Sequence, residues 1–367
     1  MAGERFPCRG CGAETRFDPE RGGLACPFCG AATPLTKAAG FAAAEHDLDD
    51  AAEADAAESG KPPPLPSADN APAKRGCPQC GAQFAPPAGE RTVRCPFCGS
   101  QFVKALEQAA HLDKPESLIP LAVGPKKAKE LFTDWLATGW FHPSALKREG
   151  KLGELSGFYL PVWTFDAQTR TRYTAEHGRR VSETYFAEEN GQQVTRTRTH
   201  MEWTPVSGSR EDFFDDVLVP AAHEELQNFL ERAGDFDLQN GLTPYRQEYL
   251  AGWGALDPAL DRKAGWQEAA EKMKTTVEER CTEDVGGDGC RNLNAQIDWS
   301  DEKYKLTLLP YWLCAYQWRE KPYRFVINGQ TGKIAGDKPL SVVKIVFAVL
   351  LALAVIGVIA MLSQGGK

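Results

Sequence analysis

Eight cysteines in four Cys-x-x-Cys pairs place the strongest constraint on what this chain can fold into. The pairs are Cys8/Cys11, Cys26/Cys29, Cys77/Cys80 and Cys95/Cys98. In each half of the set, fourteen residues separate the inner cysteines, and each cysteine of the second half lies 69 positions after its counterpart. The chain therefore carries an internal duplication of a short cysteine module.

The spacing predicts a metal site in each module. Two residues between cysteines allow a tight knuckle that aims both sulfurs at one ion, and zinc prefers four tetrahedral ligands. A glycine, which tolerates positive φ, follows every pair. We therefore predict two structural zinc ions, and iron in a rubredoxin-like site is the alternative. Four sulfurs leave no open coordination position, so we expect no catalysis at the metal. The predicted ligands are Cys8, Cys11, Cys26 and Cys29 in the first ribbon and Cys77, Cys80, Cys95 and Cys98 in the second.

Cysteine usage and charge limit the classes of protein that fit. Residues 1–30 contain no apolar run behind a basic start, so no secretory signal peptide is expected. Paired cysteines without such a signal favour metal binding in a reducing compartment over disulfides. The formal net charge of −8 lacks the basic excess typical of proteins that bind nucleic acid.

The segment between the two cysteine modules has the composition of a linker. Residues 42–57 are rich in alanine and acidic side chains, and Lys61 to Pro66 is almost entirely proline. Because so little of this sequence is apolar, burial cannot offset the entropy of ordering it. We predict a flexible acidic linker over 36–74, with a short helix over 42–57 as the alternative.

Residues 105–339 mix helical and strand patterns. Apolar residues recur at helical spacing over 126–138, and Asp257-Pro258 is typical of the start of a second helix that runs towards Gly286. The segments with strand character are 158–165, 168–174, 194–203, 304–309, 312–318 and 323–327. The sequence therefore predicts an α+β domain with a mainly antiparallel sheet.

The C-terminal segment predicts a transmembrane helix. As a helix, Ser341 to Leu362 would extend about 33 Å, which matches a hydrocarbon core of about 30 Å. A buried core helix is the alternative. Lys333, Lys338 and Lys344 precede the uncharged part of the segment (345–362) and only Lys367 follows it, which favours a tail-anchored, single-pass protein of the cell membrane with its N-terminal region in the cytoplasm.

The expected domains follow from these patterns. They are a first zinc ribbon (1–35), the acidic and proline-rich linker (36–74), a second zinc ribbon (75–104), an α+β cytoplasmic domain (105–339), a transmembrane helix (340–362) and a short tail (363–367).

Two Thr-Arg-Thr-Arg segments form a second candidate site. Arg170 and Arg172 would share one face of a strand, as would Arg196 and Arg198. If the two strands paired with these faces aligned, four guanidinium groups would cluster. The cluster is either a solvated face balanced by neighbouring glutamates or an anion-binding site for lipid headgroups or for the acidic linker.

Catalytic motifs are missing from the sequence. There is no phosphate-binding Gly-x-x-x-x-Gly-Lys-Ser/Thr loop and no Gly-x-Ser-x-Gly nucleophile elbow, and the six histidines form no visible ligand set. We expect neither an enzyme nor a small-molecule substrate.

The two cysteine modules, the segments Phe158 to Asp166 and Tyr323 to Lys333, and the terminal apolar span together resemble bacterial TFIIB-type zinc-ribbon membrane proteins. Relatives of this kind are often labelled primosomal or helicase-like, and some associate with phage-shock and SPFH-type proteins. The resemblance implies a scaffold at the inner face of a stressed membrane. The expected function is a tail-anchored adaptor that recruits cytoplasmic proteins to the lipid bilayer. The alternative is a membrane-tethered protein that binds nucleic acid through the second ribbon.

Overall fold

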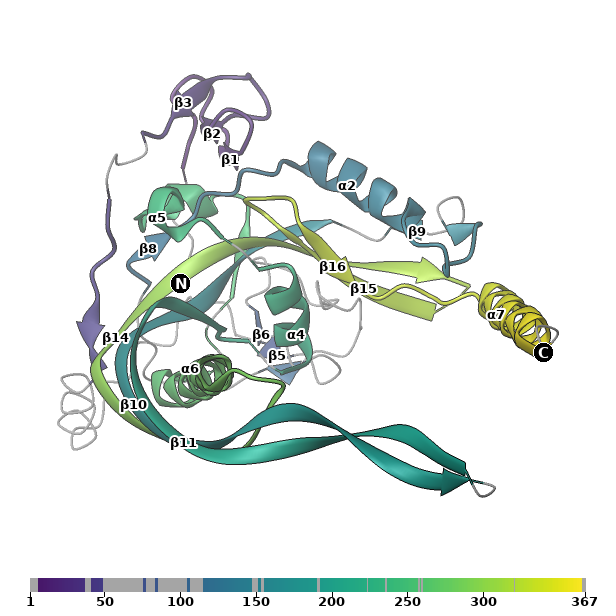
Figure 1. Ribbon diagram of the computed structural model, residues 1–367. Helices are drawn as coiled ribbons and strands as arrows, with labels where there is room; N and C mark the ends of the chain where they lie inside the picture. The colour runs from purple at the N-terminus through teal and green to yellow at the C-terminus, as the bar shows by residue number, and fades with distance from the viewer. Residues whose placement is uncertain are drawn as a thin grey trace.

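The computed structural model describes most of the chain outside the region between the first ribbon and residue 115 (Figure 1). The described residues are 6–36, 41–48, 75–76, 83–84, 104–105, 115–146, 151–152, 155–189, 192–222, 224–234, 236–256, 258, 260–319 and 321–364.

Short strands and turns flank three very long strands. In chain order the elements are β1 (Arg16–Asp18), β2 (Gly23–Ala25), β3 (Ala32–Pro34), β4 (His46–Asp47), β5 (Arg75–Gly76), β6 (Gln83–Phe84), β7 (Lys104–Ala105), β8 (Ser117–Leu118), α2 (Pro125–Ala137), β9 (Lys151–Leu152), β10 (Ser156–Glu189), β11 (Gln192–Pro220), α4 (Glu224–Arg232), α5 (Leu238–Gly241), β12 (Thr243–Pro244), the 3-10 helix η1 (Gln247–Leu250), β13 (Gly254–Ala255), α6 (Arg262–Val285), β14 (Gly289–Trp318), β15 (Lys321–Asn328), β16 (Ile334–Gly336) and α7 (Val342–Gln364).

One large sheet dominates the fold. Its central path runs β11-β10-β14-β15-β16 with antiparallel neighbours, while β10 with β13 and β14 with β8 pair in parallel, so the ten-stranded sheet is mixed. Strands make up 46% of the described residues and helices 27%. The predicted α+β class with a mainly antiparallel sheet is therefore wrong. The sequence segments 158–165 and 168–174 fuse into β10, and 304–309 and 312–318 fuse into β14, which adds strand at the expense of loops.

Two prolines lie inside the long strands, and one of them, Pro310, falls in the gap between the predicted segments 304–309 and 312–318. Proline has no N–H to give to a ladder. On one side, Pro161 pairs with Leu308 of β14. On the other side, β10 pairs with β13 up to Tyr159 and with β11 from Val162 onward, so Pro161 lies between these two ladders. Pro310 occupies the same kind of gap, between the β8 and β15 pairings of β14. Each proline therefore interrupts one neighbour only, and the strand continues.

Helix α6 fills the curve that β10, β11 and β14 make together (Figure 1). It begins at Arg262, after Asp261 caps it by accepting a hydrogen bond from the Ala264 N–H at 2.7 Å, and not at Asp257-Pro258 as predicted. Its buried residues recur at helical spacing and pack against aromatic rings of β10: Ala269, Met273, Val277 and Cys281 against Trp163 and Phe165. This core fixes the helix against the sheet.

The helix predicted over 126–138 is confirmed as α2, which packs against the β15–β16 end of the sheet. Phe132 is 3% exposed and its ring stacks on Phe325 with the centroids 4.5 Å apart. Beyond α2, the loop around Phe141 anchors the start of α7, because the Ser341 N–H donates to the Phe141 carbonyl at 2.8 Å.

The prediction for the C-terminal segment is corrected. A membrane crossing takes about 20 consecutive apolar residues in one helix. Within the described ranges, no helix is both long and apolar enough to meet that requirement. The predicted transmembrane helix over 340–362 is therefore wrong, and so is the predicted single-pass membrane localisation.

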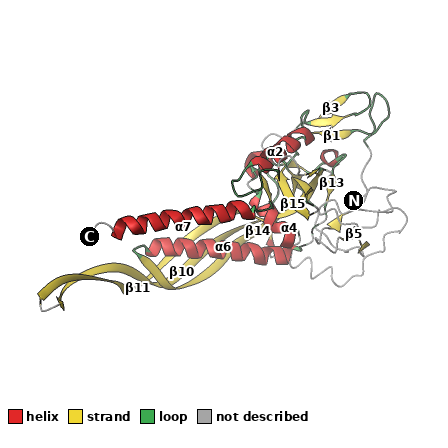
Figure 2. Ribbon diagram, turned by 90° about the vertical axis from the view of Figure 1, so that its right-hand side faces the viewer, coloured by secondary structure: helices red, strands yellow, loops and turns green. Residues whose placement is uncertain are grey.

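A two-stranded arm extends from the sheet (Figures 1 and 2). Pairing of β10 with β14 ends where Gly178 meets Gly289, whereas β10 and β11 continue together to Glu189 and Gln192. We call residues 179–189 and 192–202 the arm. Both views place its tip at the opposite end of the molecule from the first cysteine module.

The packing of α6 yields a stability prediction. Phe165→Ala removes a ring that is 0% exposed, so it should lower the free energy of unfolding by about 3–5 kcal/mol in a urea titration. The matched control is Phe213→Ala, a ring on β11 that is 63% exposed and should matter far less. Equal losses in the two variants would contradict the described core.

Candidate metal centre

The first cysteine module folds into two equivalent knuckles. The Cys8 N–H donates to the Ala13 carbonyl at 2.7 Å, and the Gly12 N–H donates back to the Cys8 carbonyl at 2.8 Å. Gly12 has φ of 74°, a left-handed conformation that glycine adopts without a steric penalty. The second knuckle repeats this pattern around Cys26, with Gly30 also at φ 74°. The glycines predicted for this purpose are therefore placed as expected.

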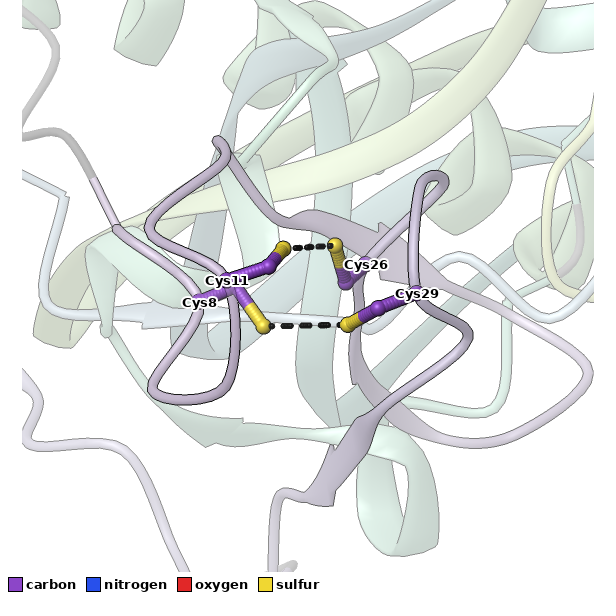
Figure 3. Close-up of side chains that lie close together, drawn as sticks. All are labelled: Cys8, Cys11, Cys26 and Cys29. Atoms are coloured by element: carbon purple, nitrogen blue, oxygen red, sulfur yellow. Dashed lines mark hydrogen bonds between the residues drawn. The ribbon is translucent and has the colours of Figure 1, made fainter.

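The knuckles bring the four sulfurs together, as Figure 3 shows. The Cys8 and Cys29 Sγ atoms lie 3.5 Å apart, and so do those of Cys11 and Cys26. All four sulfurs lie within 4.8 Å of one another. Zinc–sulfur bonds of about 2.3 Å in a tetrahedron separate the sulfurs by about 3.8 Å. The arrangement therefore fits one tetrahedral metal ion.

Backbone N–H groups favour the thiolate forms that a metal requires. The Gly10 N–H donates to the Cys8 Sγ at 3.4 Å, and together with the Cys11 N–H it lowers the pKa of Cys8. The Cys29 N–H is the main group that lowers the pKa of Cys26, to about 6. Stabilised thiolates at Cys8 and Cys26 release fewer protons when metal binds near neutral pH, whereas hydrogen bonds between the neighbouring sulfurs raise the pKa of Cys11 and Cys29.

The cysteine module is attached to the body of the protein through Phe17. This ring is 3% exposed and contacts Tyr249 of η1 edge-on, with the centroids 5.2 Å apart. The Phe17 N–H donates to the Ala251 carbonyl at 2.8 Å, and the Trp253 indole N–H donates to the Phe17 carbonyl at 3.0 Å. Apolar packing and two hydrogen bonds thus hold the metal centre against the fold.

The second cysteine module can be compared only in part. Its short strands β5, β6 and β7 form a three-stranded sheet in the order β6-β5-β7. Its predicted ligands lie outside the described residues: Cys77, Cys80, Cys95 and Cys98. A second metal ion therefore stays a prediction.

The four arginines of the predicted anion site do not come together. In the β10–β11 register, Arg172 pairs with Ser209 and Arg198 pairs with Glu183. Eleven residues of β10 separate positions 172 and 183, about 36 Å along the strand. Arg170 contacts Glu211 at 2.8 Å, and Arg172 contacts Asp298 at 3.3 Å. The pairing partners of the two Thr-Arg segments thus differ from those the sequence suggested.

The structure reveals a partly buried polar cluster that sequence reasoning missed. Asp166, Asp215 and Asp216 bring carboxylate oxygens within 4.8 Å of one another where the β10–β11 register shifts. Lys305, which is 7% exposed, contacts Asp216 at 2.6 Å and Glu45 at 3.3 Å and supplies the balancing cation. The only sequence signal for this cluster is the pair of adjacent acids at 215–216. The cluster depends on an irregularity in the pairing of β10 with β11, which no sequence pattern predicts.

This cluster also involves part of the predicted linker. Glu45 contacts Lys303 at 3.7 Å, and β4 pairs with β14 through His46 and Asp47. Residues 41–48 therefore run along the edge of the large sheet, where Glu45 meets the half-exposed Lys303 and the buried Lys305.

Comparison with known proteins gives limited information. No protein-family model matches the chain, and no solved structure matches it. Over 240 residues the chain is 24% identical to Uncharacterized protein YdjG of Bacillus subtilis (strain 168). The match covers 62% of this chain and 64% of that protein, so the chain spans just under two thirds of the relative's length.

The four-sulfur centre predicts a stoichiometric loss of metal. Cys26→Ser should remove one equivalent of bound metal from the purified chain, because one thiolate of four is gone, as measured by elemental analysis. Cys290→Ser, at a half-buried cysteine in β14, is the control and should leave the metal content unchanged. Unaltered metal content in Cys26→Ser would rule out this site.

The partly buried cluster predicts a pH-dependent stability. Burial raises the pKa of Asp166 from 3.8 to about 6, so the folded state binds this proton more tightly than the unfolded state does. Ionisation therefore destabilises the fold as pH rises from about 4 to above 6. Asp166→Asn keeps an acceptor for the Asp216 N–H and lacks the ionisation. Relative to wild type, it should gain up to about 3 kcal/mol between pH 4 and pH 7 in denaturant titrations.

The exposed Asp298→Asn is the control for this comparison, since its carboxylate contacts Arg172 with half of its side chain in solvent. A difference between Asp166→Asn and wild type that stayed constant with pH would contradict the assignment.

Proposed function

We propose that this chain is a zinc-ribbon adaptor that binds other proteins. In this proposal both cysteine modules hold zinc, and the ion maintains the shape of a binding surface. The proposal does not depend on a membrane.

The chemistry of the first site supports a structural role for the ion. Four sulfurs complete a tetrahedron, so no position stays open for water or substrate. A short module with few buried side chains depends on its metal for stability. The metal would therefore hold the knuckles and whatever they display.

Phe28 is the observation on which the proposal rests. It lies between Cys26 and Cys29 at the tip of the second knuckle, and its side chain is 80% exposed. A large aromatic ring on a rigid support is the kind of residue that anchors protein interfaces. The sequence of the second module repeats the feature, with Phe97 between Cys95 and Cys98.

The charge around the first knuckles favours a protein partner over nucleic acid. Arg21 contacts Asp18 at 3.5 Å, and the other basic and acidic residues of the module are close to balanced. Binding to phosphates needs an excess of positive charge on one surface. Nucleic-acid binding by the second module is the competing candidate, because its sequence is more basic.

The proposal predicts that Phe28→Ala will lose a protein partner. The tagged full-length chain, loaded with zinc, would be used for affinity capture, with Phe213→Ala as the control for a different exposed aromatic. We expect at least a tenfold weaker recovery of a specific protein with Phe28→Ala only, because an anchor of this kind contributes about 2 kcal/mol or more. Recovery of nucleic acid that high salt releases, without a protein that depends on Phe28, would contradict the proposal.

A further inference from the structure

We propose that the arm pairs with the arm of a second copy of this chain, with the free edges of their β11 strands antiparallel. The result is a two-fold dimer in which one sheet continues across both copies. This goes beyond the adaptor function, because the surface involved lies at the far end of the molecule from the first ribbon (Figures 1 and 2).

β11 is an edge strand of 29 residues. It pairs with β10 on one side, and on its other side no described strand pairs with it. Its outer backbone N–H and C=O groups thus form a template for another strand.

The arm part of this edge lacks two of the features that normally prevent pairing. Natural edge strands are protected by charged side chains, lysine above all, by proline or by a bulge. Residues 192–202 contain no lysine or proline, and the register with β10 is unbroken there, so the charged side chains of Arg196, Arg198 and Glu202 are what a partner strand must neutralise. The first proline of β11 is Pro205, just past this segment, and its only bulge lies near Asp215. The arm edge is therefore open, while the rest of β11 is interrupted.

The arm also lacks support within one copy. A two-stranded ribbon is marginally stable in water unless a third strand or a helix covers it. Near the base of the arm, the Arg180 N–H donates to the Asp288 carboxylate at 2.7 Å. Beyond that contact, residues 181–189 and 192–200 pair with each other. Tyr185 is 46% exposed and Phe186 is 75% exposed. A neighbouring strand would supply the missing support.

Charge complementarity supports a second copy as the partner, and the proposed register is centred on His200. In an antiparallel pair centred on His200, Arg198 lies opposite Glu202 of the other copy, and the symmetry makes this contact twice. Centring on Arg198 or Glu202 would instead oppose like charges. Glu202 is available, since its side chain is 52% exposed and its contacts to Arg179 and His200 are long, at 3.8 and 3.9 Å.

The test is a charge-exchange experiment on the full-length chain, followed by analytical ultracentrifugation. Wild type should form a dimer. Arg198→Glu and Glu202→Arg should each weaken association at least tenfold. In a dimer of either variant, positions 198 and 202 of the two copies carry the same charge, and they face each other at two symmetry-related places. A mixture of the two variants should form a heterodimer, since both cross-copy contacts are then of opposite sign. Arg180→Glu, on the other strand of the arm, is the control and should dimerise like wild type.

A cysteine placed at the two-fold axis tests where the two β11 strands meet, because it can form a disulfide with the same residue of the other copy. Opposed residues in antiparallel strands have Cα atoms about 4.5–5.5 Å apart, which a disulfide can bridge. His200→Cys should therefore form an inter-chain disulfide under mild oxidation, and Tyr185→Cys, on β10, should not. A monomeric wild type, a dimer unaffected by Arg198→Glu, or a dimer without the His200→Cys crosslink would each overturn the proposal.

Discussion

The antiparallel register between β10 and β14 is the constraint on which the rest of the structure depends. β10 and β14 pair with Leu160 opposite Leu309, and this register decides which side chains of the two strands face each side of the sheet. Towards the arm, the register turns Trp163 and Phe165 to α6. Towards the other end, the ring of Trp312 contacts the ring of Trp253 edge-on, with the centroids 5.3 Å apart. The Trp253 indole N–H in turn donates a hydrogen bond to the Phe17 carbonyl of the first cysteine module. A shift of one residue would break both assemblies at once.

This connection makes the metal centre part of the folded body. The sequence of contacts runs from the sheet through Trp312, Trp253 and Phe17 to the knuckles. Phe28 is therefore presented by a surface that is fixed at both ends, by the metal and by the body. The arm presents a different surface at the far end of the same long strands. A protein with one aromatic knuckle and one open sheet edge, well separated, has the layout expected of an adaptor that assembles with others.

Local chemistry decided how much the sequence could predict. The cysteine knuckles and their glycines follow from ligand spacing and φ alone, so the first site was predicted residue by residue. Helix α2 followed from the spacing of Leu131, Phe132 and their neighbours. The strand lengths did not follow, since Pro310 signals a break that the gap between the β8 and β15 ladders makes unnecessary. Arg172 and Arg198 were paired wrongly because the register is set by contacts far along the chain. The cluster around Asp166 depends on a bulge that no local pattern signals.

Hydrogen exchange of the full-length chain, with zinc bound and after chelation, tests most directly whether the metal centre and the body form one unit. The account predicts that removal of zinc speeds exchange in residues 6–36 and also in residues 247–253, where η1 and Trp253 meet Phe17. Faster exchange confined to residues 6–36, with residues 247–253 as protected as before, would contradict it.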